Sequence, residues 1–187
     1  MIYESLAVVL NEINEHLSAR VGLFEDRVIM STLVNPDGSI PIGNENKVVA
    51  TLVNVAREGI INSSGGGGMG GGFSYGKVPI KLNLYVMFTS CFDDSNYEES
   101  LKFLSHILSF FQYKNVFTPQ NSDLDGRVRQ LHFEIAKLSF HELSNIWAYL
   151  GAKYSPSVVY LVRYIHFEED YVDGIGSAIS GSDSSTR

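Results

Sequence analysis

Three stretches of the chain repeat apolar residues at the spacing of one helix face, and each predicts an α-helix. They cover residues 2–20, 96–112 and 140–150. The third is the best marked, because Ser139 and Glu142 have the spacing of a capping box and Gly151 follows where a left-handed residue ends a helix. The predicted inward-facing residues are Ile2, Leu6, Val9, Leu10, Ile13 and Leu17; Tyr97, Leu101, Leu104, Leu108 and Phe111; and Leu143, Ile146, Trp147 and Leu150.

Five further stretches predict β-strands, at residues 27–34, 47–55, 78–88, 130–138 and 158–167. Residues 78–88 alternate apolar and polar positions, as in a half-buried strand. In residues 130–138 the same alternation points Leu131, Phe133 and Ile135 inward. Residues 47–55 are nearly all apolar on both faces apart from Thr51 and Asn54, which suits a strand covered on two sides. Residues 158–167 are so rich in β-branched and aromatic residues that they indicate a central strand. This order predicts a single-domain α+β fold: a mainly antiparallel sheet of about five strands with three helices packed on it.

Two segments do not fit this pattern, and they set the predicted domain limits. Every residue from Gly65 to Gly72 is glycine except Met69, so the loop at 62–76 cannot build a core. A mobile excursion is the simpler interpretation; the alternative is a loop that carries Met69, Phe73 and Tyr75 onto a partner. The segment 168–187 begins with Glu168, Glu169 and Asp170 and continues rich in Gly and Ser. We therefore predict a domain over 1–167 and a tail that is disordered or ordered only in an assembly.

Composition excludes several function classes. The formal net charge is -7, and no cluster of Lys or Arg is present, which argues against binding nucleic acid or an anionic membrane. No apolar run is long enough to span a membrane, and the N-terminal helix carries acidic residues unlike a signal peptide, so we expect synthesis and assembly in the cytoplasm. The single cysteine, Cys91, is interpreted as a small core residue. Proteins are the expected partners of this acidic chain.

Candidate chemistry is sparse. Residues 121–126 imitate the first half of a calcium loop, but His132 stands where the loop needs a bidentate Glu, so a polar turn is the better interpretation. The five histidines have no metal-ligand spacing, and no nucleophile motif occurs. The sequence therefore predicts no catalytic, cofactor-binding or metal-binding residue. An enzyme or ligand-binding domain whose site converges only in three dimensions stays open as an alternative.

Four segments, taken together and in order, resemble a known family. They are Asn46–Val55, Pro79–Phe88, Tyr97–Gln112 and Leu143–Tyr164, the last reading Leu-Ser-Asn-Ile-Trp-Ala-Tyr-Leu-Gly-Ala-Lys-Tyr-Ser-Pro-Ser-Val-Val-Tyr-Leu-Val-Arg-Tyr. This pattern is similar to the cap, or tail-terminator, proteins of phage-tail-like extracellular contractile injection systems of the antifeeding-prophage type.

The resemblance implies a structural, non-enzymatic protein. Such a cap forms a hexameric ring on the distal end of the particle, ends the inner tube and sheath, and contacts both. The candidate partner contacts are Met69, Phe73, Tyr75, Glu168, Glu169 and Asp170. An adaptor or baseplate component of the same particle is the alternative, and the sequence leaves open whether the particle is released or held at a membrane.

Overall fold

The structure is a computed structural model, which describes residues 1–22, 25–58 and 80–166. The elements follow one another as α1 (Ile2–Val21), β1 (Val28–Met30), β2 (Lys47–Arg57), β3 (Ile80–Cys91), α2 (Tyr97–Tyr113), β4 (Val116–Phe117), β5 (Val128–Ile135), α3 (Phe140–Leu150) and β6 (Ser157–His166). Short 3-10 turns at Ile42–Asn44 and Asp94–Asn96 precede β2 and α2. The predicted α+β class is confirmed.

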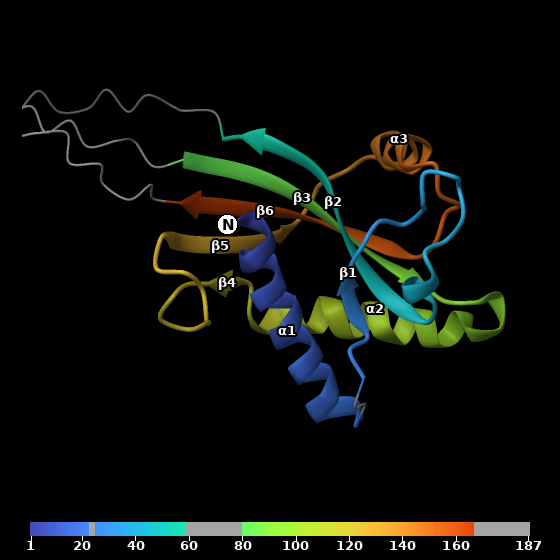
Figure 1. Cartoon of the computed structure of the whole chain (residues 1–187), viewed down its shortest axis with the longest axis horizontal. Coiled ribbons are helices and arrows are strands. Elements are labelled where there is room, and N and C mark those ends of the chain that lie inside the picture. The colour runs from blue at the N-terminus through green and yellow to red at the C-terminus, as the bar shows by residue number, and fades with distance from the viewer. Residues whose placement is uncertain (23–24, 59–79, 167–187) are drawn as a thin grey trace, which may run out of the picture.

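Within the described residues, six strands form one sheet in the order β1-β2-β3-β6-β5-β4. Neighbouring strands are antiparallel, except that β1 runs parallel to β2 with Val28 opposite Val48. Helices α1 and α2 cover one face of the sheet, and α3 covers the other (Figure 1). Strand β6 is central, as the composition of residues 158–167 predicts.

The larger core lies between the sheet and the helices α1 and α2. At its centre is Phe111 of α2, whose ring centroid is 4.5 Å from those of Phe133 and Tyr160 and 5.5 Å from that of Phe88. These rings come from β5, β6 and β3, so one side chain ties α2 to three strands. The predicted inward face of α1 is confirmed, because Leu6, Val9, Leu10, Ile13 and Leu17 are all buried in this core.

The smaller core lies on the opposite face, under α3. Its buried residues are Leu33, Val49, Met87, Trp147 and Val159, with Leu143, Ile146 and Leu150 packed at its edge. The local signals that predict α3 are all present: Ser139 and Glu142 form the capping box, and Gly151 has φ 66°. The hydrogen bonds from the Ser139 backbone and hydroxyl lower the pKa of Glu142, which favours the charged carboxylate at the start of the helix.

The predicted inward face of α2 is wrong for most of its residues. Tyr97, Leu101 and Leu108 are exposed, whereas Ser100, Phe103, Ile107, Phe110 and Phe111 are buried. The helix carries two apolar stripes, and periodicity cannot choose between them. The stripe of phenylalanines faces the sheet because it buries the larger apolar area.

The sheet also differs from the prediction of about five mainly antiparallel strands. It has an additional strand, β4, which the sequence analysis missed because two residues give no readable alternation. The first predicted strand, 27–34, shortens to β1 and pairs in parallel, since the chain returns to β2 through a long connection. Ile135, predicted inward, is 58% exposed at the last position of β5. The predictions for 62–76 and 168–187 lie outside the described residues.

On the outer side of β1, the side chain of Asn14 hydrogen-bonds to the strand's backbone as a neighbouring strand would. The side-chain oxygen of Asn14 accepts hydrogen bonds from the backbone N–H groups of Arg27 at 3.1 Å and Val28 at 2.9 Å, and its amide donates to the Val28 carbonyl at 2.9 Å. Asn14 therefore satisfies the outward backbone groups of Val28 at the start of β1 and fixes α1 to that strand.

Truncation of Trp147 tests whether the smaller core supports the fold. Trp147 is only 7% exposed and packs edge-on against Tyr154. We expect Trp147→Ala to lower the free energy of unfolding by about 3–5 kcal/mol, measured by urea denaturation. Tyr149→Ala is the control on the same helix, because Tyr149 is 83% exposed. Equal stabilities of the two variants would contradict the assignment.

Removal of the Asn14 amide tests the cap on β1. Asn14→Ala leaves three backbone hydrogen bonds unmade. We expect a loss of about 1–3 kcal/mol in unfolding free energy, because polar groups are left without partners. Asn11→Ala, an exposed position one turn earlier in α1, is expected to have almost no effect.

Candidate interaction surfaces

An apolar stripe runs along the outside of α2. Tyr97, Leu101 and Leu108 are 55%, 41% and 37% exposed, and Leu104 lies half-buried between them. These residues recur at i, i+4, i+7 and i+11, so they share one side of the helix. We name them the α2 stripe. Aligned exposed apolar residues of this kind are typical of contact surfaces.

A pocket lies on the other side of the sheet, at the end of α3. Its volume is about 420 Å³, and its walls come from residues 33–45, from residues 89–93 at the end of β3 and just beyond it, and from residues 147–155 at the end of α3. We name it the α3 pocket. Figure 1 shows α3 and the connection between β1 and β2 on the same side of the sheet. The pocket forms there because the αL turn at Gly151 sends the chain back towards β6 beside that connection.

The lining of the α3 pocket gives little support to catalysis. It contains the carboxyl groups of Glu45 and Asp93, the ammonium group of Lys153 and the Cys91 thiol, and none of its described residues is a histidine. Burial raises the pKa of the Cys91 thiol to about 11, so the thiol is protonated at neutral pH. A protonated thiol is a poor nucleophile, which agrees with the interpretation of Cys91 as a packing residue.

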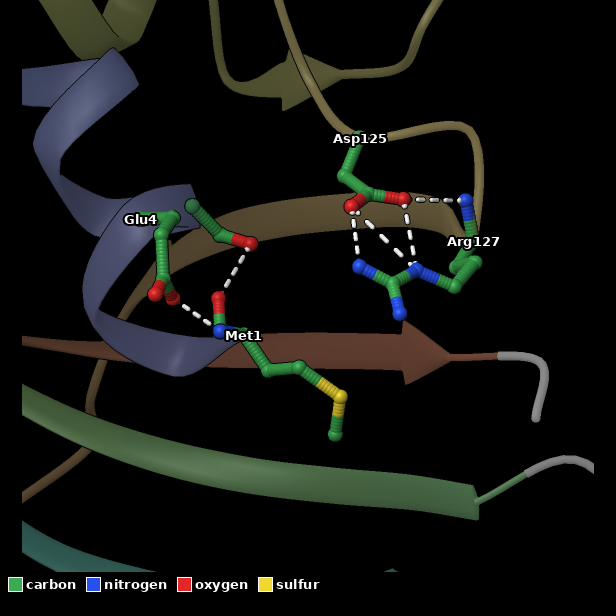
Figure 2. A network of polar contacts seen from close by, with 5 residues as sticks. Met1, Glu4, Asp125 and Arg127 are labelled. Carbon is green, nitrogen blue, oxygen red and sulfur yellow. Dashed lines mark hydrogen bonds and ion pairs between the residues drawn. The ribbon is translucent and has the colours of Figure 1, made fainter. Parts of the chain in front are cut away.

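Other charged groups are paired with close neighbours. Figure 2 shows the Met1 amino group against the Glu4 carboxylate, and Asp125 accepting from the Arg127 guanidinium at 2.6 Å. The hydrogen bond from the Met1 amino group lowers the pKa of Glu4. Lys114 binds Glu12 at 2.5 Å and the Asn121 carbonyl at 2.8 Å. The two contacts of Lys114, which directly follows α2, connect the loop before β5 to α1, and a polar turn was predicted in this loop.

The predicted partner-contact residues lie outside the part of the chain that the structure describes. The candidate partner contacts Met69, Phe73, Tyr75, Glu168, Glu169 and Asp170 all lie outside the described residues. Across residues 1–22, 25–58 and 80–166, no three side chains of His, Cys, Asp or Glu are grouped as a metal site. None of the helices in this part of the chain is long and apolar enough to cross a membrane. The α3 pocket has no counterpart among the sequence patterns, because its walls come from three separate segments.

The class defined by these features is an α+β domain with an exposed apolar helix face and a mixed polar and apolar pocket. The chain belongs to the Pvc16 N-terminal domain family, which it matches over residues 6–180. A search of curated proteins found no match.

The chain also resembles a solved structure. This is the cryo-EM structure of the PVC sheath/tube terminator, in the extended state, of an extracellular contractile injection system. The sequence identity is 15% and the TM-score 0.49, and the match covers 95% of this chain and 64% of that one. This chain thus spans slightly less than two thirds of the length of that terminator chain.

Alkylation of Cys91 tests the electrostatics of the pocket. The pKa of about 11 is two units above the usual value of 9.0, so the thiolate fraction at pH 8 should be about 100-fold smaller than in the unfolded chain. We expect iodoacetamide to react with the folded protein more slowly by at least that factor. Because the folded state retains its proton between pH 9 and 11, this group makes stability fall as pH rises through that window. Equal rates in folded and urea-unfolded protein would contradict the pKa.

Proposed function

We propose that this chain is a structural cap that ends the inner tube and sheath of a contractile injection system. The observation that carries the proposal is the match to the Pvc16 N-terminal domain family over residues 6–180, which is almost the whole chain. The four sequence segments that resemble cap proteins support it, since all four lie inside that range. The proposed role is non-enzymatic, and the particle assembles in the cytoplasm.

The partners in this proposal are the last rings of sheath and tube subunits. The α2 stripe is one proposed contact surface. Covering Leu101 and Leu108 with a partner removes their apolar surface from water, which favours binding. The loop residues Met69, Phe73 and Tyr75 and the tail residues Glu168, Glu169 and Asp170 are further proposed contacts. The net charge of -7 favours partner surfaces with positive charge.

We further propose that six copies form a ring through one repeated head-to-tail contact. The edge of the sheet supports such a contact. Strand β1 pairs with β2 only from Val48 to Ala50, and among the described residues no strand pairs with the outer side of β2 beyond that point. Leu52 and Val55 on this stretch are 39% and 44% exposed. The β-bulge between Leu52 and Asn54 makes the edge irregular, which restricts pairing to a partner of matching shape.

Complementation of a strain that lacks this chain tests the cap role. We expect particles without the chain to have tubes and sheaths of irregular length in electron micrographs, and the wild-type chain to restore a uniform end. The double variant Leu101→Asp, Leu108→Asp should fold but fail to restore it, because two charges interrupt the α2 stripe. Ser109→Asp, at an exposed position of the same helix, is the matched control.

One outcome would contradict the cap role, and another would contradict only the proposed use of the α2 stripe. A resolved tail end without this chain, or with the chain in the baseplate, would exclude the cap role. Restoration by the double variant as complete as by the control would leave the cap role intact but remove the α2 stripe from its contacts.

A further inference from the structure

We propose that two unassembled copies of this chain pair through the open edge of β2, over residues 54–58, as antiparallel strands related by a twofold axis. This pairing covers the sheet edge that supports the proposed ring, so it withholds the ring contact until a tail end is present. The second statement rests on the proposed function, whereas the pairing itself does not.

Strand β2 continues beyond the strand that covers its outer side. Figure 1 shows β2 extending past β1, which pairs with residues 48–50 only. On the inner side, the Glu58 N–H donates to the Lys81 carbonyl at 3.0 Å. Residues that bond to the neighbouring strand alternate with residues that point away from it along an antiparallel pair. Val55 and Arg57 therefore direct their N–H and C=O groups away from β3.

Among the described residues, these outward groups have few partners. The Val55 N–H donates to the side-chain oxygen of Asn54 at 2.9 Å. No described group bonds to the Val55 carbonyl or to the N–H and carbonyl of Arg57. Asn54 and Arg57 are exposed and Val55 is 44% exposed, so a partner strand can reach this backbone, replace the Asn54 oxygen and pair the remaining groups.

The outer strands of the sheet are closed by asparagine side chains. On β4, the Val116 carbonyl accepts from the Asn121 amide at 3.0 Å, and the Thr118 N–H donates to the Asn121 side-chain oxygen at 2.8 Å. Asn14 covers the outward groups of Val28 on β1 in the same manner. Among the described strands, β2 beyond residue 50 is thus the longest stretch that has no neighbour on one side.

This arrangement selects a second copy related by a twofold axis as the occupant. Head-to-tail pairing of strands needs two different open edges on each copy, and the edge at β4 is closed. A twofold axis brings the same patch of both copies together, so one open edge is sufficient. The β2 edge of one copy therefore pairs with the β2 edge of the other.

One register fits this stretch. An axis at Ala56 sets Val55 of each copy opposite Arg57 of the other, where the two residues exchange backbone hydrogen bonds. The arginine stems then cover the exposed Val55 side chains, and the Asn54 amide donates to the Glu58 carboxylate opposite it. An axis at Arg57 would place like charges opposite each other, and an axis at Val55 would include the bulge before Asn54.

The contact is small, which makes the pairing reversible. Standard interfaces use roughly 20–30 residues on each side, and this stretch is much shorter. We therefore expect a dissociation constant of about 10–100 μM. A subunit held in such a dimer can leave it for the larger contacts of the ring and the tail end.

A disulfide at the twofold axis tests the pairing. Opposite residues that share no hydrogen bonds have Cα atoms about 4.5 Å apart, a distance that a disulfide spans. We expect Ala56→Cys to form covalent dimers at least tenfold faster than Ser109→Cys, which places the thiol at an exposed position of α2. The wild-type chain, with Cys91 alone, should form no more than Ser109→Cys. A head-to-tail contact does not bring residue 56 against residue 56, so this disulfide reports twofold pairing alone.

Two substitutions should abolish the pairing by different means. Val55→Pro removes an outward N–H and leaves the bonds between β2 and β3 in place. Ala56→Lys sets two ammonium groups opposite each other at the axis. In sedimentation equilibrium we expect both variants to be monomers at concentrations where the wild-type chain is mainly dimeric, with melting temperatures close to that of the wild type. Ala148→Lys, the same substitution at an exposed position of α3, is the matched control and should leave the dimer intact.

The covalent dimer of Ala56→Cys tests the link to assembly. The purified chain is added to particles from the strain that lacks it, and binding to the open ends is observed in micrographs. We expect the reduced Ala56→Cys chain to bind these ends, the oxidised dimer to leave them bare, and reduction of that dimer to restore binding. Equal binding by the oxidised and reduced chains would overturn the withholding of the ring contact and leave the pairing intact.

Three results would overturn the pairing. Covalent dimers that form no faster for Ala56→Cys than for Ser109→Cys would exclude the twofold register. A wild-type chain that stays monomeric at every concentration would exclude a second copy as the occupant. A hexamer in solution without the disulfide at residue 56 would assign the β2 edge to the ring alone. The cap role is judged separately by complementation, so each of these results leaves it standing.

Discussion

The packing of Phe111 against three strands is the interaction on which the rest of the structure depends. Its ring lies against Phe88 of β3, Phe133 of β5 and Tyr160 of β6, and Phe117 of β4 lies 6.4 Å away. Aromatic rings in offset and edge-on contact bury large areas and prefer particular geometries. This cluster therefore fixes both the distance of α2 from the sheet and the rotation of α2 about its own axis. The rotation in turn determines which apolar stripe of α2 remains at the surface.

The sequence predicted those parts of the fold in which local signals agree. The capping box and Gly151 define α3, the single apolar face defines α1, and the alternation of residues 78–88 defines most of β3. The sequence did not predict the buried face of a helix where two faces have the same apolar pattern. The two stripes of α2 have equal periodicity, and only the contacts of Phe103, Ile107, Phe110 and Phe111 with the sheet select one of them. Strand β4 forms because Val116 and Phe117 pair with His132 and Leu131 of β5. This pairing joins segments that are distant in the sequence, so the local pattern of residues does not predict it.

The candidate sites were less accessible to sequence analysis than the fold. Residues 121–126 lie in a loop of turns, as the polar-turn interpretation predicts, and Asp125 pairs with Arg127 two residues later. The α3 pocket, however, joins Asn44, Thr89 and Trp147 from three separate segments, and one polar side-chain atom of each has no hydrogen-bond partner among the described residues. A sequence shows donors and acceptors but does not show which of them stay unsatisfied. Such a site becomes visible only after every hydrogen bond of the fold has been assigned.

The layered arrangement gives the domain two unlike faces. Helices α1 and α2 cover one face of the sheet, with the α2 stripe directed outward, while α3 and its pocket lie on the other. A protein that extends a polymer needs matching surfaces at its two ends, so that each subunit recreates the site to which it was added. A protein that ends a polymer needs the opposite property: one surface that fits the growing end, and no copy of that end elsewhere. An apolar helix face and a pocket of mixed polar and apolar lining, separated by the thickness of the sheet, cannot substitute for each other. In the proposed ring, this asymmetry lets the subunits bind the tube and sheath without offering them a new end.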